Sequence, residues 1–264
     1  MVFISLSSLI LATAAVSASG GVPATPAPNP GPPFVTDDPE PVEFQHYEVY
    51  VASEYFRYFG QSTGTMPHLE INYGGAPNLQ LHVIAPLSYS TTSGQPFAYG
   101  PGDTELGFKY RFVQESKNMP MVGIFPLVEL PTGAPSRGLG SGSTAFFLPV
   151  WLQKSVGTWT TYGGGGFWHN PGAGNHDYWF SGLTVQCQTT QKLMVGAEIF
   201  HTTRQADGFG DITGFNIGGV YDLDEGHHLM MSLGTGIQGS NHGTAYAAYQ
   251  WTFGPKEKKD KDEK

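Results

Sequence analysis

The sequence predicts an all-β protein: an antiparallel, up-and-down transmembrane β-barrel of about twelve strands. Three observations predict it: strand-length segments with two contrasting faces, loops that alternate between long and short, and an apolar leader with no later run long enough for a membrane helix. The 264 residues include 36 glycines and 20 prolines, and no helical period of useful length is found. A chain that enters a membrane without helices has to close a barrel, because a bilayer tolerates no open sheet edge.

The segment 104–112 shows the two faces most clearly. Its even positions are Thr, Leu, Phe, Tyr and Phe, whereas its odd positions are Glu, Gly, Lys and Arg. Side chains alternate between the two faces of a strand, so one face is apolar and the other charged. In a membrane barrel the apolar face meets lipid and the charged face lines the lumen.

Further segments of strand length follow along the chain, separated by turn residues. Odd-numbered connections, such as Arg57–Met66 and Pro131–Gly142, are long, while even-numbered ones, such as Ser155–Val156, are short. Outer-membrane barrels have long extracellular loops and short periplasmic turns, whereas a secreted β-sandwich has no reason to keep this alternation. The expected strands are 45–56, 67–73, 78–89, 103–113, 119–130, 143–154, 157–168, 176–188, 191–201, 211–223, 227–237 and 243–253.

The chain is predicted to have four parts. Residues 1–18 have the apolar run and small-x-small end of a signal peptide, although Lys and Arg are absent before the run. Residues 19–43 are rich in proline and predict an extended periplasmic linker. Residues 44–253 form the barrel, and residues 254–264 are a charged, solvated C-terminal tail.

Charge and cysteine content limit the possible functions. The formal net charge is -9, so there is no basic surface for nucleic acid, and nucleic-acid binding is not expected. Cys187 is the only cysteine and cannot form a disulfide within the chain. The histidines have no standard metal-ligand spacing, so we expect no metal and no cofactor. The oligomeric state is not predicted by any feature of the sequence.

Charged residues on the inward positions predict a narrow, partly polar path. Their mixed charge fits either a selectivity role or a lattice of cross-strand ion pairs that stiffens the wall. A net acidic lumen favours cations or neutral solutes over anions, and we expect Lys109 and Arg111 to pair with Glu129 on the next strand. The lumen-lining candidates are Glu48, Glu54, Glu70, His82, Glu105, Lys109, Arg111, Glu129, Lys154 and Glu198.

Breaks in the strand pattern identify candidate gates or kinks. Pro126 and Pro149 lie inside expected strands, where a missing N–H disrupts the ladder and indicates a place for a lateral gate. A run of four glycines removes side chains from another strand. It indicates either a kink, a lateral opening or space for a solute or, more simply, strong local curvature or close contact with a bulky neighbouring strand. These glycines are Gly163, Gly164, Gly165 and Gly166.

Aromatic residues gather near the ends of the expected strands. An aromatic girdle at the membrane interface accounts for this position, and the terminal aromatic residue Phe253 resembles the signal by which the barrel-assembly machinery recognises its substrates. The girdle candidates are Tyr47, Tyr55, Tyr73, Tyr89, Trp151, Trp159, Trp168 and Trp179.

Several stretches together resemble a bacterial family named for the MetA pathway of phenol degradation. The resemblance rests on GPPFVTDDPEPVE, GDTELGFKYRF, PLVELPTG, GLGSGSTAFFLPVWLQKS and WTTYGGGGFWHNPG, and covers about residues 31–253. Members of this family are outer-membrane barrels described as transporters. The resemblance implies an exported, porin-like barrel associated with aromatic catabolism, and it supplies no catalytic residues.

The predicted function is passive uptake of small solutes, aromatic or apolar ones among them, by a non-enzymatic channel in the bacterial outer membrane. Its expected partners are outer-membrane lipid, a small-molecule solute and the barrel-assembly machinery. Two alternatives stay open: a non-transporting structural or adhesin-type barrel, and an outer-membrane lipid hydrolase. The hydrolase is the weaker of the two because no GxSxG sequence is present.

Overall fold

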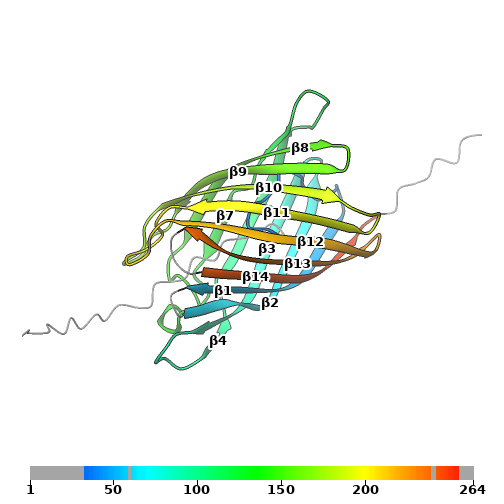
Figure 1. Ribbon diagram of the computed structural model, residues 1–264. Helices are drawn as coiled ribbons and strands as arrows, with labels where there is room; N and C mark the ends of the chain where they lie inside the picture. Colours follow the sequence, from blue (N-terminus) through cyan, green and yellow to red (C-terminus); the bar gives the residue numbers. More distant parts are fainter. Residues whose placement is uncertain (1–32, 59–60, 239–241, 256–264) are drawn as a thin grey trace, which may run out of the picture.

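The computed structural model describes residues 33–58, 61–238 and 242–255, which form one closed antiparallel β-barrel (Figure 1). The expected signal peptide and almost all of the expected C-terminal tail lie outside these residues. The described residues contain no helix with the length and apolar character needed to cross a membrane.

Fourteen strands fill twelve positions around the described wall. Both β4 and β5 pair with β3, and both β6 and β7 lie between β5 and β8, so each of these two pairs occupies one position. The prediction of about twelve antiparallel strands is confirmed. The strands are β1 (Tyr47–Tyr58), β2 (Gln61–Ala76), β3 (Leu79–Thr91), β4 (Ala98–Pro101), β5 (Thr104–Val113), β6 (Met121–Ile124), β7 (Leu127–Leu130), β8 (Ala145–Val156), β9 (Trp159–His169), β10 (Tyr178–Gln188), β11 (Leu193–Thr202), β12 (Ile212–Asp224), β13 (His227–Gln238) and β14 (His242–Phe253); a 3₁₀ turn, η1, spans Pro135–Arg137.

The barrel closes where the first strand pairs with the last. The register of β1 against β14 runs from Tyr47 opposite Phe253 to Tyr58 opposite His242. Tight connections at 157–158 and 225–226 define the turn end of the barrel, and the connections 131–144, 170–177 and 203–211 define the loop end. Because outer-membrane barrels place short turns in the periplasm, the loop end is the extracellular one.

One expected loop is mostly strand. Residues predicted as the connection Arg57–Met66 extend β1 and β2 instead, with Arg57 opposite Ser62 and Glu54 opposite Thr65. The glycine and serine content of this stretch indicated a loop, but a bulge between Ala52 and Glu54 absorbs the irregularity and the ladder continues.

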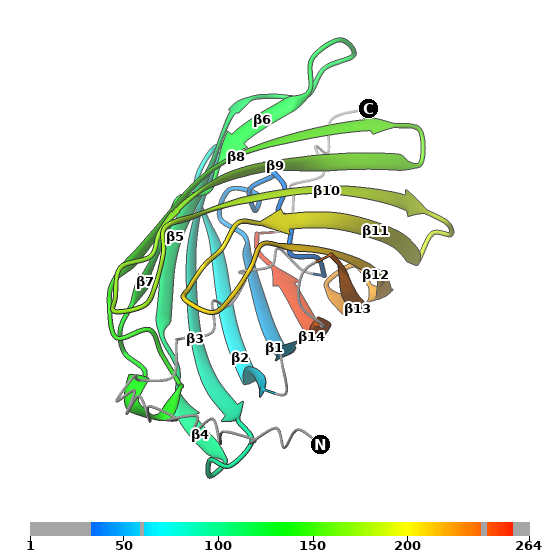
Figure 2. The same cartoon turned by 60° about the vertical axis from the view of Figure 1, so that its left-hand side comes forward.

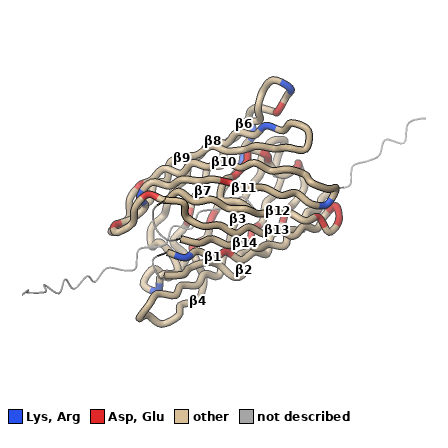
Figure 3. Tube along the Cα trace, in the orientation of Figure 1, with Lys and Arg blue, Asp and Glu red and all other residues tan. Residues whose placement is uncertain are grey.

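The outer wall of the barrel is apolar. Exposed side chains on it include Leu148, Ile217, Met231 and Leu233, while charged residues lie at the strand ends and at positions along the strands (Figure 3), where the buried ones face the lumen. An edgeless barrel with an apolar outer wall is stable in lipid, and in bacteria such barrels lie in the outer membrane. The predicted outer-membrane location is therefore confirmed.

Aromatic side chains form part of a girdle at the turn end. Tyr47 stacks on Tyr73 at a centroid distance of 4.5 Å and on Phe253 at 5.3 Å, and Trp159 is exposed. Two of the predicted girdle residues do not lie on the outer wall. Trp151 and Trp168 are buried in the lumen, because their strand positions point inward.

The four glycines of β9 lie against neighbouring strands. A Cβ at Gly164 would meet the Val150 carbonyl oxygen and the Trp151 ring, and a Cβ at Gly166 would lie 2.5 Å from Pro149 Cα. Similar contacts with β10 limit Gly163 and Gly165. These contacts agree with the structural interpretation of the glycine run, in which missing side chains allow β8 and β10 to approach.

We therefore expect Gly166→Val to impair folding of the barrel. The added atoms overlap β8, and overpacking of this kind costs about 1–3 kcal/mol or more. The measurement is the temperature at which the compact gel band of the detergent-solubilised protein disappears, which should fall. Gly210→Val is the matched control, since a Cβ there would meet no described atom within 4 Å. An unchanged transition for Gly166→Val would contradict the structural role.

Candidate functional site in the barrel lumen

Residues 33–42, here called the lumen segment, lie inside the barrel. Figure 2 shows this stretch, in blue before β1, within the ring of strands. Phe34 and Thr36 are fully buried, and Asp37 is 5% exposed. The prediction of a periplasmic linker over residues 19–43 is therefore wrong for residues 33–42. Residues 19–32 lie outside the described residues. Proline content correctly excluded a strand, but it did not indicate that the wall would bind the segment.

Hydrogen bonds and an ion pair hold the lumen segment on opposite sides of the lumen. The carboxylate of Glu198 on β11 accepts the backbone N–H groups of Val35 and Thr36, both at 2.8 Å. Across the lumen, Lys109 Nζ on β5 lies 2.8 Å from Asp37 Oδ1. The Val42 N–H donates to Gln80 Oε1 on β3 at 3.0 Å. The segment is therefore tied to three strands around the barrel.

Glycines on the inner wall make room for the segment. A Cβ at Gly182 would collide with the Thr36 side chain, and one at Gly196 would lie 3.1 Å from the Phe34 ring. A Cβ at Gly123 would lie 3.0 Å from Pro39 Cβ. These missing side chains shape the wall to the segment.

One half of the inner wall carries a buried polar network. On β2, β3 and β5, His82 Nε2 lies 2.8 Å from Glu105 Oε1, and His82 Nδ1 lies 2.6 Å from Asn72 Oδ1. Asn72 Nδ2 donates to Glu70 at 2.7 Å, and His68 lies between Glu70 and Glu54 at 3.8 and 3.7 Å. The network favours the ion-pair lattice that the sequence left as one of two interpretations.

The other half of the inner wall is aromatic. Phe147 on β8 stacks on Trp168 of β9 at 4.7 Å, and Trp168 stacks on Tyr178 of β10 at 5.9 Å. Trp151 and Phe180 make edge contacts at 6.1 Å beside them. The lumen therefore has a polar wall and an aromatic wall, with the lumen segment between them.

Two main cavities remain in the described lumen. A cavity of about 110 Å³ at the loop end is lined by Glu54, Glu129, Trp168 and Tyr178, among other residues. A cavity of about 270 Å³ toward the turn end is lined by the lumen segment and by residues of the polar wall, including Lys109. The two cavities share no lining residue, and residues of the lumen segment line only the second of them.

Most of the predicted lumen residues lie on the inner face, and Lys154 does not. Lys154 shares the outward face of β8 with Leu148 and Leu152, and its Nζ bonds to Glu115 at 3.0 Å in the turn after β5. Because the inward face of β8 is mostly aromatic, the strand has no polar face, and the charge of Lys154 did not indicate whether its side chain points inward or outward. The inner-face residues are Glu48, Glu54, Glu70, His82, Glu105, Lys109, Arg111, Glu129 and Glu198.

The expected pairing of Lys109 and Arg111 with Glu129 is wrong. The register places Glu129 opposite Glu105, near the loop end, whereas Arg111 lies opposite Gly123 toward the turn end. Arg111 instead donates to Asn78 at 2.7 Å. Because β5 runs antiparallel to β6 and β7, its last residues pair with β6 and its first residues with β7. Arg111 and Glu129 therefore lie toward opposite ends of the barrel.

Pro126 and Pro149 face the same break in the ladder. Pairing of β6 with β8 ends at Ile124 opposite Val150, and pairing of β7 begins at Leu127 opposite Phe147. The predicted disruption is present at Pro126, whereas β8 continues through Pro149. On the lumen side the buried ring of Phe125 fills this place, 5.1 Å from the His82 ring. A lateral gate here stays a proposal.

Loop histidines pair with aspartates. His169 lies 3.1 Å from Asp177, and His176 lies 2.7 Å from Asp207. The backbone N–H of Asn170 lowers the pKa of Asp177, and His169 adds to this effect. The described residues contain no group of three or more His, Cys, Asp or Glu residues that could hold a metal ion.

Asp37, Asp38 and the aromatic wall were missed as site residues. The two aspartates were assigned to the linker, although a basic inward residue such as Lys109 needs an acidic partner when buried. Trp151 and Trp168 could have been found from strict alternation along β8 and β9, had polarity not been given more weight.

Comparison with solved structures finds the same fold in outer-membrane proteins. An outer membrane channel from Pseudomonas putida F1 superposes with a TM-score of 0.69 at 15% identity, over 85% of this chain and 99% of that chain. The chain has the fold of that channel. The KdgM porin superposes with a TM-score of 0.55 at 10% identity, over 78% of this chain and 99% of that chain. The NanC porin superposes with a TM-score of 0.54 at 8% identity, over 77% of this chain and 98% of that chain. No protein-family model and no curated protein matches the chain.

Proposed function

We propose that the protein is a passive channel for small solutes, aromatic or apolar ones among them, across the bacterial outer membrane. The observation that carries the proposal is the lumen: a polar wall and an aromatic wall enclose two cavities, and a segment without secondary structure occupies the space between the walls. Conduction then requires the lumen segment to move. The fold shared with the Pseudomonas putida F1 channel supports this function.

The two walls suit a solute with both aromatic and polar groups. Phe147, Trp168 and Tyr178 form a stacked row, and an aromatic solute can extend such a row or contact its edges at centroid distances of about 4.5–7 Å. The acidic groups of the opposite wall accept hydrogen bonds from hydroxyl or amino groups. An anionic solute would be repelled by the same carboxylates.

The test is solute flux through the purified full chain in liposomes. Swelling rates are compared for neutral, cationic and anionic aromatic solutes of equal size, beside protein-free liposomes. We expect neutral and cationic solutes to enter several times faster than anionic ones. A second candidate is a non-transporting barrel, which the filled lumen favours; absence of flux in both the wild type and a variant with a displaced lumen segment would support it and overturn the channel.

A further inference from the structure

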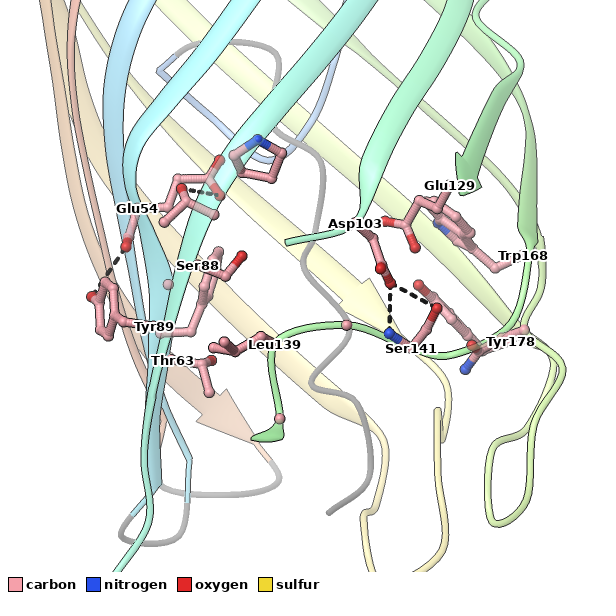
Figure 4. Close-up of a pocket in the computed structure, with 17 residues that line it drawn as sticks. Glu54, Thr63, Ser88, Tyr89, Asp103, Glu129, Leu139, Ser141, Trp168 and Tyr178 are labelled. Atoms are coloured by element: carbon pink, nitrogen blue, oxygen red, sulfur yellow. Dashed lines mark hydrogen bonds between the residues drawn. The ribbon is translucent and has the colours of Figure 1, made fainter. Parts of the chain in front are cut away.

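The loop-end cavity has the chemistry of a binding site for an organic cation. Its described lining includes the carboxylates of Glu54, Asp103 and Glu129 and the rings of Trp168 and Tyr178, and it includes no Lys, Arg or His. Figure 4 shows Glu129, Trp168 and Tyr178 on one side of the cavity and Glu54 on the other. Negative charge and aromatic rings therefore line one space.

The three carboxylates differ in what they already bind. Asp103 accepts hydrogen bonds from Gly133 and Ser141, so it anchors the loop after β7. Glu54 is 3% exposed; its Oε2 accepts a bond from Thr65 at 3.4 Å, and its Oε1 lies 3.7 Å from His68. Glu129 has no hydrogen bond or ion pair with any described residue, and its neighbour across the ladder is another acid, Glu105. A carboxylate in such a place is costly to keep charged unless a cation reaches it.

A second group in the cavity also lacks a partner. Tyr178 is 4% exposed, and its hydroxyl makes no hydrogen bond with the described residues. Its ring stacks on Trp168, with an interplanar angle of 15°. A buried phenol normally finds a hydrogen-bond partner, so the hydroxyl, like the Glu129 carboxylate, is available to a ligand.

The size of the cavity limits the ligand. Its volume is about 110 Å³, which is of the order of the roughly 150 Å³ engineered cavity that binds benzene. The cavity is therefore large enough for a body near the size of one ring. Trp168 is stacked between Phe147 and Tyr178, so its ring offers the cavity an apolar edge rather than a free face.

We propose that this cavity binds a small protonated amine with an apolar or aromatic body. The ammonium group donates to Glu129 and to the Tyr178 hydroxyl, and the body packs against Trp168. The proposal rests on the proposed channel function for the arrival of the ligand, whereas binding itself needs no transport.

The experiment measures binding by calorimetry to the full chain in detergent micelles. The probes are benzylammonium, the neutral benzyl alcohol and the anionic benzoate. A charge-assisted hydrogen bond is worth about ten- to hundredfold in affinity, so benzylammonium should bind tighter than benzyl alcohol by about that factor, and benzoate should not bind. Glu129→Gln should remove this advantage and leave benzyl alcohol unchanged.

Two further variants keep the test interpretable. Tyr178→Phe removes only the hydroxyl and should weaken benzylammonium binding by about two- to tenfold. Glu43→Gln removes a carboxylate whose side chain is 82% exposed near the turn end and should change nothing. Equal binding of benzylammonium and benzyl alcohol, or unchanged binding in both cavity variants, would overturn the proposal. Flux without amine binding refutes this site alone, and amine binding without flux refutes only the channel.

Discussion

Replacing Gly182 with valine is expected to move the lumen segment off the wall and raise the conductance of the barrel. The three described atoms nearest to a Cβ at this position all belong to the Thr36 side chain, with Cβ and Cγ2 at 3.0 and 3.1 Å. The added side chain therefore collides first with the segment, and valine suits a strand. Overpacking of about 1–3 kcal/mol lowers the ratio of molecules with a bound segment to molecules with a displaced one by about 5- to 150-fold.

Two readouts separate displacement from damage. Planar-bilayer recordings report conductance, and maleimide labelling of Thr36→Cys in a Cys187→Ser background reports exposure of the segment, since Thr36 is fully buried in the wild type. The matched control is Gly75→Val, where the nearest described atoms are those of the Leu81 side chain at 3.4 Å. If the Gly182→Val barrel folds while its conductance and labelling match the wild type, the segment is not the barrier.

Replacing Lys109 with methionine is expected to destabilise the protein and release the segment. Lys109 is 6% exposed, and its ammonium group lies 2.8 Å from Asp37 and 3.5 Å from Asp38. Removing one partner of a buried ion pair leaves an uncompensated charge and costs about 3–5 kcal/mol. The heat-induced transition of the compact gel band should shift to lower temperature, and maleimide should label Thr36→Cys faster.

The double variant Lys109→Met with Asp37→Asn distinguishes charge from packing. It removes both charges, so it should recover part of the lost stability, because an unpaired carboxylate is the main cost. Lys192→Met makes the same substitution near the turn end, where the ammonium group donates to the Leu223 carbonyl and to no other described residue, and should have little effect. If Lys109→Met has no more effect than Lys192→Met, the ion pair does not hold the segment.

The fold was predictable because alternation is a local property. Along β5 the two faces differ so clearly that Glu105 and Lys109 could be placed inward from the sequence alone. Along β8 both faces are apolar, and the direction of Lys154 and Trp151 depended on strand phase, which polarity did not reveal.

The site was less predictable because its contacts are distant in sequence. Glu198 was correctly placed in the lumen, yet its partners Val35 and Thr36 lie 163 and 162 residues away. A proline-rich stretch has the same composition whether it crosses the periplasm or fills a lumen. Only the glycines that receive it, such as Gly182, distinguish the two, and a glycine in a strand has several possible causes.

The position of the lumen segment inside the barrel also constrains the order of folding. The first described residues of the chain bond to β11, so these contacts cannot form until most of the wall has been synthesised and assembled. Between Lys109 and Glu198 the segment spans the barrel from one side to the other, and a sheet that ends before β11 offers only one of these two attachments. Burial of the segment is therefore a late event in folding, and a buried segment indicates that the barrel wall has formed at least as far as β11.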